Sequence, residues 1–100
     1  MSALELGGKQ RRTLRGLGHA LEPVVYIGKE GVTDPLVAAV DAALTTHELI
    51  KVKLGQGAPI DRHDAAAELA RRTGSGVAQV LGRTMLLYRA HPGEPKLKLP

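Results

Sequence analysis

Cysteine, phenylalanine and tryptophan are absent from this chain of 100 residues. Without cysteine, the chain cannot form a disulfide framework or a thiolate metal site. Its aromatic side chains, histidine apart, are only Tyr26 and Tyr88. Proteins that bind single-stranded RNA by base stacking use aromatic platforms, which this composition does not offer. We therefore expect any RNA recognition to depend on phosphate, sugar and shape.

Long apolar runs are also absent. No segment approaches the roughly 20 apolar residues of a membrane-spanning helix, and the N-terminal residues lack the apolar run of a signal peptide. These absences predict a soluble, cytoplasmic protein with no membrane partner. A chain of this length can bury roughly 60–70% of its unfolded surface, so a hydrophobic core is feasible. We place a single domain at residues 4–100.

Positive charge is in excess and unevenly distributed. The formal net charge is +4 at pH 7. Residues 1–50 carry five basic and six acidic side chains, whereas residues 51–100 carry nine basic and four acidic ones. Four of the five cations in the first half lie in one short segment, namely Lys9, Arg11, Arg12 and Arg15. A basic surface favours a polyanionic partner, and simple solubility is the alternative.

A glycine-bracketed stretch is central to our interpretation. Residues 24–27 are apolar and mostly β-branched, which predicts a buried strand. Gly28 and Gly31 then bracket a turn that can approach a ligand without a Cβ in the way. Thr33 or Asp34 can cap the helix that follows. A basic Gly-x-x-Gly loop is thus directed at a helix N-terminus, where backbone N–H groups favour phosphate.

The remaining segments alternate between helix and strand. The pattern predicts helices at residues 9–22, 34–46 and 62–73, strands at 49–54, 77–81 and 85–88, and a tight hairpin at 82–84. Strands that alternate with helices form parallel pairs joined by right-handed crossovers, and the final hairpin adds an antiparallel strand. The sequence therefore predicts an α/β fold with helices packed on a small, mixed four-stranded sheet.

Cations lie beside apolar positions in two of these segments. The first helix has one apolar arc, which we expect to be buried, and its arginines occupy the adjoining arc. That apolar arc consists of Leu14, Leu17 and Leu21. In residues 49–54, alternate apolar side chains face the core, so Lys51 and Lys53 point to the opposite face. We expect the first-helix cations and the Gly-x-x-Gly loop to converge on one side of the molecule.

Several motifs occur in the order typical of a known family. They are Lys9-Gln10-Arg11-Arg12-x-Leu14-Arg15, Pro23-Val24-Val25, Ile27-Gly28-x-x-Gly31-Val32-Thr33, His47-Glu48-Leu49-Ile50-Lys51-Val52-Lys53, Thr73-Gly74 and Leu87-Tyr88-Arg89. On these motifs the chain resembles the stand-alone bacterial YhbY-like proteins, which consist of a single CRM domain (chloroplast RNA splicing and ribosome maturation). The resemblance covers about Leu6 to Pro100, and residues 47–53 are its most specific part.

This resemblance implies both a fold and a function. The fold is like that of the C-terminal domain of bacterial translation initiation factor three, a two-layer sandwich of order β-α-β-α-β-β, with an extra N-terminal helix. The function is RNA binding in association with precursors of the large ribosomal subunit, so large-subunit rRNA is the implied partner. We expect no DNA partner and no cofactor.

The candidate RNA-binding residues come from the loop and the basic segments. The family's Gly-x-x-Gly loop resembles the backbone clamp of KH domains and maps onto residues 28–31, where Glu30 departs from an ideal clamp because a carboxylate repels phosphate. The candidates are Lys9, Arg11, Arg12, Arg15, Gly28, Lys29, Glu30, Gly31, Lys51 and Lys53. The alternatives are an ordinary strand-to-helix turn, a solvated helix face and a solvent-facing strand.

Catalytic or metal chemistry has little support in the sequence. No two of the four histidines share a metal-ligand spacing, and no serine has an apparent base partner. Asp61 and Asp64 are better explained as helix-start residues than as an acid–base pair. We expect no catalytic residue and no metal site. His47 is expected to pack against or cap the end of the second helix, and Tyr26 to be a packed strand residue.

Other functions compete with RNA binding in ribosome assembly. The chain could be a protein-interaction module that docks on a ribosomal protein, or a general RNA chaperone. A small enzyme of RNA metabolism is a third alternative, which the absence of a convergent nucleophile, base or metal set disfavours.

Overall fold

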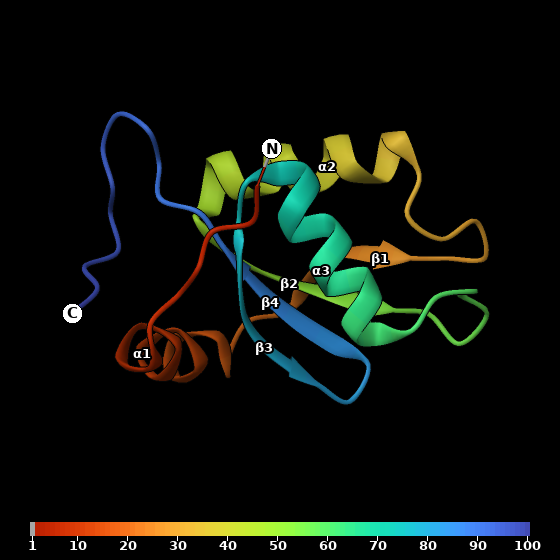
Figure 1. Cartoon of the computed structure of the whole chain (residues 1–100), viewed down its shortest axis with the longest axis horizontal. Helices are drawn as coiled ribbons and strands as arrows, with labels where there is room; N and C mark the ends of the chain where they lie inside the picture. The colour runs from red at the N-terminus through yellow and green to blue at the C-terminus, as the bar shows by residue number, and fades with distance from the viewer. Residues whose placement is uncertain (1) are drawn as a thin grey trace.

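The part of the chain that the structure describes folds into three helices and four strands. The computed structural model describes residues 2–100. In chain order the elements are α1 (Gly8–Gly18), β1 (Pro23–Ile27), α2 (Asp34–His47), β2 (Leu49–Leu54), α3 (Arg62–Thr73), β3 (Gly76–Leu81) and β4 (Thr84–Tyr88). The strands form one sheet in the order β1-β2-β4-β3 (Figure 1). β1 is parallel to β2, whereas β4 is antiparallel to β2 and β3, so the predicted mixed sheet is confirmed.

Helices cover both faces of the sheet. α2 and α3 pack on one face over the larger core, in which Ile27, Leu44 and Leu69 are fully buried. α1 packs on the opposite face over a smaller cluster that includes Leu14 and Leu86. The predicted extra N-terminal helix is therefore present, and it forms a third layer, separated from α2 by the sheet in Figure 1.

Local capping signals set the helix boundaries. The Thr33 hydroxyl accepts a backbone N–H of the first turn at 3.2 Å and so caps α2. The Asp61 carboxylate accepts the N–H groups of His63 at 2.9 Å and Asp64 at 3.2 Å, which lowers the pKa of the Asp61 carboxyl, chiefly through the Asp64 N–H. Gly74, with φ of +67°, ends α3. Within residues 2–100, no helix is both long and apolar enough to cross a membrane.

α1 ends at Gly18, short of the predicted end at Glu22. Leu14 is fully buried, but Leu17 is 48% exposed and Leu21 is 36% exposed, so the prediction that all three leucines are buried is wrong. A Cβ on Gly18 would lie only 2.5 Å from Cδ1 of Leu86. The last turn of the helix therefore lies very close to the sheet, and the chain leaves the helix there to reach β1.

Two of the glycines of α1, Gly16 and Gly18, offer a matched test of this close approach. Gly16→Ala meets no atom within 4 Å and should raise the free energy of unfolding by up to about 1 kcal/mol, because alanine favours helix. Gly18→Ala should lower it by about 1–2 kcal/mol, because overpacking against Leu86 exceeds the helix gain. Chemical denaturation measures both changes. Equal stabilisation by the two substitutions would show that the contact is loose.

The face of β1 that points away from α2 and α3 is open. Val25 and Ile27 are buried in the larger core, as expected for a strand with alternating side chains. Val24 is 49% exposed and Tyr26 is 62% exposed, so the predicted packing of Tyr26 is wrong. The cause is the placement of α1, which packs over β2, β3 and β4 and leaves the β1 edge of this face uncovered.

Candidate nucleic-acid interface

The loop after β1 combines one open glycine with one constrained glycine. The Gly31 N–H donates to the carbonyl oxygen of Gly28 at 3.0 Å and closes a tight turn. Gly31 is buried and has φ of +72°, a conformation that favours glycine. Gly28 is exposed, and a Cβ added there would meet nothing within 4 Å. The Gly28 side of the loop, with exposed Lys29 and Glu30 after it, is therefore accessible to a ligand backbone.

A second glycine-rich loop, residues 55–59, packs along the first. The Gly55 N–H donates to the carbonyl oxygen of Ile27 at 2.8 Å. A Cβ on Gly57 would lie 3.1 Å from Cγ of Lys29, so the Lys29 side chain extends across Gly57. No motif assigned a role to this loop. Its position follows from topology, because β1 and β2 are parallel and end at the same edge of the sheet.

Two arginines form hydrogen bonds to the backbone of the loops at this end of the sheet. Arg83, in the β3–β4 hairpin, donates to the carbonyl oxygens of Leu54 at 3.1 Å and Gly55 at 2.7 Å. Arg62 donates to the carbonyl oxygen of Gly82 at 3.0 Å. Both guanidinium groups hold backbone in place, and both add positive charge to the end of the molecule that carries residues 28–31.

Two other arginines form ion pairs with aspartates of α2. Arg89 forms an ion pair with Asp41 at 2.6 Å, and it also donates to the carbonyl oxygens of Asp41 and Thr73. Arg72, on α3, forms an ion pair with Asp34 at the start of α2. These two cations link α2 to α3 and to the chain after β4, so they have a structural role.

The cations of α1 are placed differently. Lys9, Arg12 and Arg15 are exposed, and none has an acidic partner within 4 Å among residues 2–100. Arg11 donates to the carbonyl oxygen of Leu6 at 3.1 Å and holds the segment before the helix. Three of the four candidate cations on α1 are therefore available to a polyanion, and the fourth also supports the fold.

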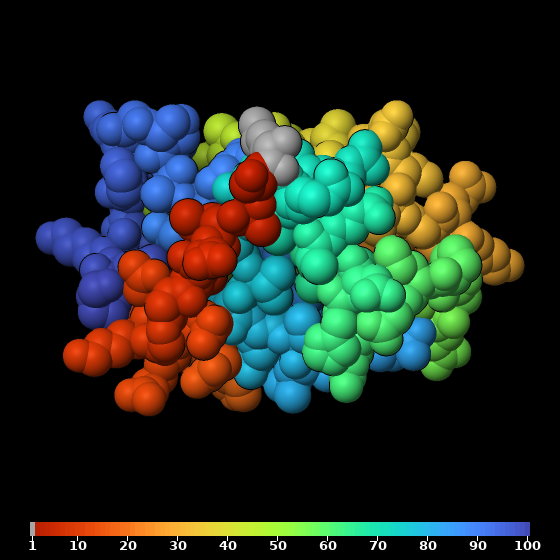
Figure 2. Space-filling model, viewed as in Figure 1, coloured from red at the N-terminus to blue at the C-terminus, as the bar shows by residue number. Residues whose placement is uncertain are grey.

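The basic helix and the Gly-x-x-Gly loop lie toward opposite ends of the molecule. α1 lies at the left of Figure 1 and the loop after β1 at the right, and Figure 2 shows the same separation on the surface. β1 runs between them, and its five residues alone span roughly 16 Å. The structure thus separates two groups that we expected to converge, because α1 stops before β1 begins and β1 then carries the chain away from it.

The lysines of β2 lie on the α1 side of the sheet. Ile50 and Val52 are buried in the larger core, so Lys51 and Lys53 point to the other face, as predicted. On that face Leu49 is buried beneath α1, Lys51 is half-buried and Lys53 is exposed. These two cations therefore lie between the helix and the loop end of the sheet.

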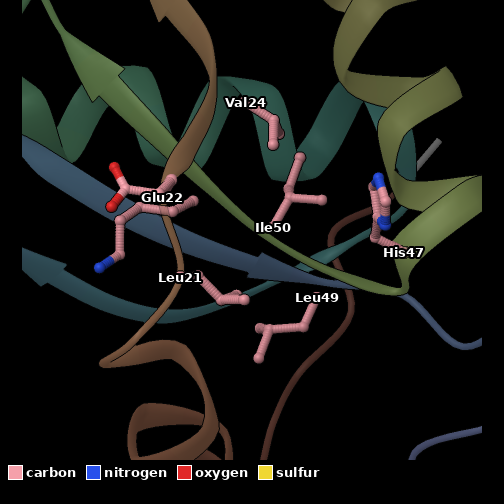
Figure 3. A pocket seen from close by; sticks show the side chains of 7 residues that line it. Leu21, Glu22, Val24, His47, Leu49 and Ile50 are labelled. Carbon is pink, nitrogen blue, oxygen red and sulfur yellow. The ribbon is translucent and has the colours of Figure 1, made fainter.

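A hollow of about 310 Å³ opens where the chain passes from α1 into β1. Its lining consists of Leu21, Glu22, Val24, His47, Leu49, Ile50 and Lys51. Figure 3 shows Glu22 and His47 on opposite sides of the apolar side chains, so the hollow does not bring an acid and a base together. His47 is exposed at the end of α2, so of its two expected roles, packing against or capping the helix end, packing is wrong; it is the basic residue of the last turn. Within residues 2–100, no cluster of acidic and histidine side chains could hold a metal ion.

Glu48 is a residue whose importance the sequence patterns did not reveal. It is only 2% exposed and has φ of +62°. Its carboxylate accepts the N–H groups of His91 at 2.6 Å, Lys96 at 2.8 Å and Leu97 at 3.0 Å. The His91 N–H, supported by the other two, lowers the pKa of Glu48 although burial opposes the shift. Its position inside the motif at residues 47–53 was the only signal.

A family model described as the CRS1 / YhbY (CRM) domain matches residues 6–89. The chain belongs to this family. The resemblance drawn from the motifs is thereby confirmed, and the Gly-x-x-Gly loop, α1 and the β2 lysines all fall within the matched part of the CRM domain.

Individual relatives agree with the family assignment. This CRM domain is 37% identical over 95 residues to a Bacillus subtilis protein named Probable RNA-binding protein YqeI, covering 95% of this chain and 99% of that one. It is also 37% identical over 95 residues to a Haemophilus influenzae protein named RNA-binding protein, covering 95% of each. The solution structure of SAV1595 from Staphylococcus aureus matches with a TM-score of 0.83 and 35% identity, covering 96% of this chain and all of that one. This match confirms the predicted fold.

Proposed function

We propose that this CRM domain binds RNA through its sugar–phosphate backbone. The observation that carries the proposal is the division among its cations. Arg72 and Arg89 form ion pairs with Asp34 and Asp41, whereas the three exposed α1 cations, Lys9, Arg12 and Arg15, have no acidic partner within 4 Å among residues 2–100. Unpaired, exposed cations on one helix attract phosphate and form hydrogen bonds to it. The names of the relatives support the same ligand class.

The Gly-x-x-Gly loop is the second proposed contact. Its exposed Gly28 leaves room for a phosphate to approach the backbone, and the side chain of Lys29 beside it supplies a positive charge. Lys51 and Lys53 lie between this loop and α1 on one face of the sheet. An RNA that touches both α1 and the loop must extend along much of the longest dimension of the molecule, which is 37 Å.

The proposed partner is large-subunit rRNA in precursors of the ribosome, in the cytoplasm. This part of the proposal follows from the family resemblance. The alternatives are docking on a ribosomal protein and general RNA chaperoning. Crosslinking the protein to RNA in cells and sequencing the bound RNA would separate rRNA from scattered transcripts. Capture of a ribosomal protein in a pull-down that persists after RNase treatment would favour docking on a protein instead.

Gly28→Asp is expected to weaken RNA binding about tenfold while the fold survives. The added carboxylate would repel phosphate, and no atom lies where its Cβ would go. Gly31 is unsuitable for this test, because any side chain is strained at its φ of +72°. Titration of fluorescent RNA measures the affinity, and thermal unfolding checks the fold.

Ala42→Asp provides the matched control for Gly28→Asp. Ala42 is exposed on α2 and the substitution changes the net charge by the same amount. It should leave RNA affinity within about twofold of the wild type, because it introduces the charge away from the proposed contacts. Unchanged binding by Gly28→Asp would mean that the loop serves only as a turn.

A further inference from the structure

One line of side chains crosses the whole sheet at the end that carries the Gly-x-x-Gly loop. Tyr26 pairs with Lys53, Lys53 pairs with Thr84, and Thr84 pairs with Leu81. Residues opposite one another in register point to the same face of a sheet. We call these four residues the cross-strand row. It includes one residue from every strand, with the aromatic residue at one edge and the leucine at the other.

The cross-strand row is open to solvent. The neighbours of its members along the chain, such as Ile27, Val52 and Met85, are buried beneath α2 and α3, so the row points to the other face. α1 covers that face only farther along the strands, where Leu49 and Leu86 are buried with Leu14. Tyr26 and Leu81 are each 62% exposed, Lys53 is exposed and Thr84 is half-buried.

We propose that the cross-strand row binds an unpaired segment of the RNA, with one base stacked on the ring of Tyr26 and a phosphate on the ammonium of Lys53. The inference rests on the proposed RNA-binding function and adds the class of RNA. Base stacking on an exposed aromatic ring tolerates any sequence, because every base has a π-face. A base in a continuous duplex cannot stack this way, so the row selects RNA with unpaired nucleotides.

Charge and continuity favour RNA as the occupant. Lys53 is the only basic or acidic residue in the row, and it has no acidic partner within 4 Å among residues 2–100. Tyr26 lies in β1, which leads directly into Gly28. An RNA segment held by the Gly-x-x-Gly loop would therefore continue directly onto the cross-strand row. The nearby carboxylates are few: Glu22 lines the hollow beyond Lys51, and Glu30 lies in the loop itself.

The amino-acid composition supplies a clean spectroscopic test. The chain has no phenylalanine or tryptophan, so its two tyrosines account for the aromatic NMR signals other than those of histidine. Tyr88 is only 6% exposed and serves as an internal control. On addition of a single-stranded oligoribonucleotide of about ten mixed nucleotides, the ring protons of Tyr26 should shift upfield through the ring current of the base, while those of Tyr88 stay in place. Ring signals of Tyr26 that do not move at saturation would overturn the proposal.

Variants of Tyr26 separate stacking from electrostatics. Tyr26→Ala should weaken binding of the single-stranded RNA about tenfold, and Tyr26→Phe should bind within about twofold of the wild type. The salt dependence should stay the same in Tyr26→Ala, because no phosphate contact is lost, whereas Lys53→Gln should reduce its slope by about 0.7. Leu4→Ala, at a side chain 43% exposed away from the row, is the matched control and should change nothing.

The outcomes distinguish this inference from the proposed function. Normal binding by Tyr26→Ala together with weakened binding by Gly28→Asp would overturn the cross-strand row and leave RNA binding by the loop intact. Failure of the wild-type protein to bind either single-stranded RNA or the matching duplex would overturn both. If the Tyr26 signals shift with protein concentration in the absence of RNA, the row is a contact between copies of the chain and the proposal is wrong.

Discussion

Glu48→Ala is expected to lower the free energy of unfolding by about 2–4 kcal/mol. Hydrogen bonds to a charged group contribute about 1.5–3 kcal/mol each, but the three contributions do not add in full, because the donor residues are partly buried or exposed and water can replace part of what is lost. The Glu48 carboxylate is the shared acceptor for three backbone N–H groups, from His91, Lys96 and Leu97. Removing it leaves these donors without their partner and releases the segment that places Leu97 and Leu99 against the smaller core. Urea denaturation measures the loss. Hydrogen exchange should show faster exchange at the three amides.

The Glu48 carboxylate also makes stability depend on pH. The three hydrogen bonds lower the pKa of Glu48 in the folded protein relative to the unfolded chain. A group with a depressed folded pKa contributes its full stabilisation above its unfolded pKa, which is about 4.3 for glutamate. That contribution is lost as the pH falls through the lower, folded pKa. Glu48→Gln should therefore be less stable than the wild type at neutral pH, and the difference should shrink below about pH 4.

The backbone at Glu48 allows the side-chain and main-chain effects to be separated. A non-glycine residue with φ of +62° is strained, and glycine relieves that strain by about 1 kcal/mol. Glu48→Gly should therefore be about 1 kcal/mol more stable than Glu48→Ala, although both lack the carboxylate. Wild-type stability in Glu48→Ala would contradict the role of the carboxylate.

The order of the elements could be predicted from local patterns, but the role of Glu48 could not. Alternating apolar positions identified residues 49–54 as a strand, and Thr33, Asp61 and Gly74 marked helix ends. These signals act over a few residues. Glu48 instead bonds to residues 43–49 positions later in the chain, and no periodicity records such a contact. The family motif marked the position without giving its physical reason.

Which side chains face the candidate interface could be predicted in part from the sequence, but how they are arranged in space could not. The alternation in β2 correctly placed Lys51 and Lys53 opposite the larger core. Whether that opposite face is covered depends on where α1 lies and ends, and its last residue, Gly18, lies very close to Leu86 in a distant strand. Because α1 ends there, Tyr26 is exposed and the α1 cations lie far from the loop. Both consequences depend on tertiary packing. The exposure of Tyr26 is the reason that our proposal adds one stacked base to the phosphate, sugar and shape recognition expected from the sequence.

Lys9→Gln, Arg12→Gln and Arg15→Gln combined are expected to weaken RNA binding about 100-fold or more at 0.1 M salt. Each phosphate contact contributes about 0.7–0.9 to the slope of log K against log salt. If the wild-type protein neutralises about four to six phosphates, its slope should be roughly −3 to −5, and the triple variant should lose about two units of it. All three side chains are exposed and glutamine is a good helix former, so α1 should persist.

A second triple variant tests whether position or total charge is responsible. Arg71→Gln, Lys96→Gln and Lys98→Gln remove the same charge from exposed positions on α3 and the C-terminal segment. If α1 makes the phosphate contacts, this control should weaken binding only a few-fold and keep the wild-type slope, because charges outside the proposed contacts act through a screened field rather than through counterion release. Equal losses in the two triple variants would mean that RNA responds to the net charge of +4 and that α1 forms no defined contact. Loss of binding confined to the α1 variant would instead mean that the cations of this helix contact the RNA directly.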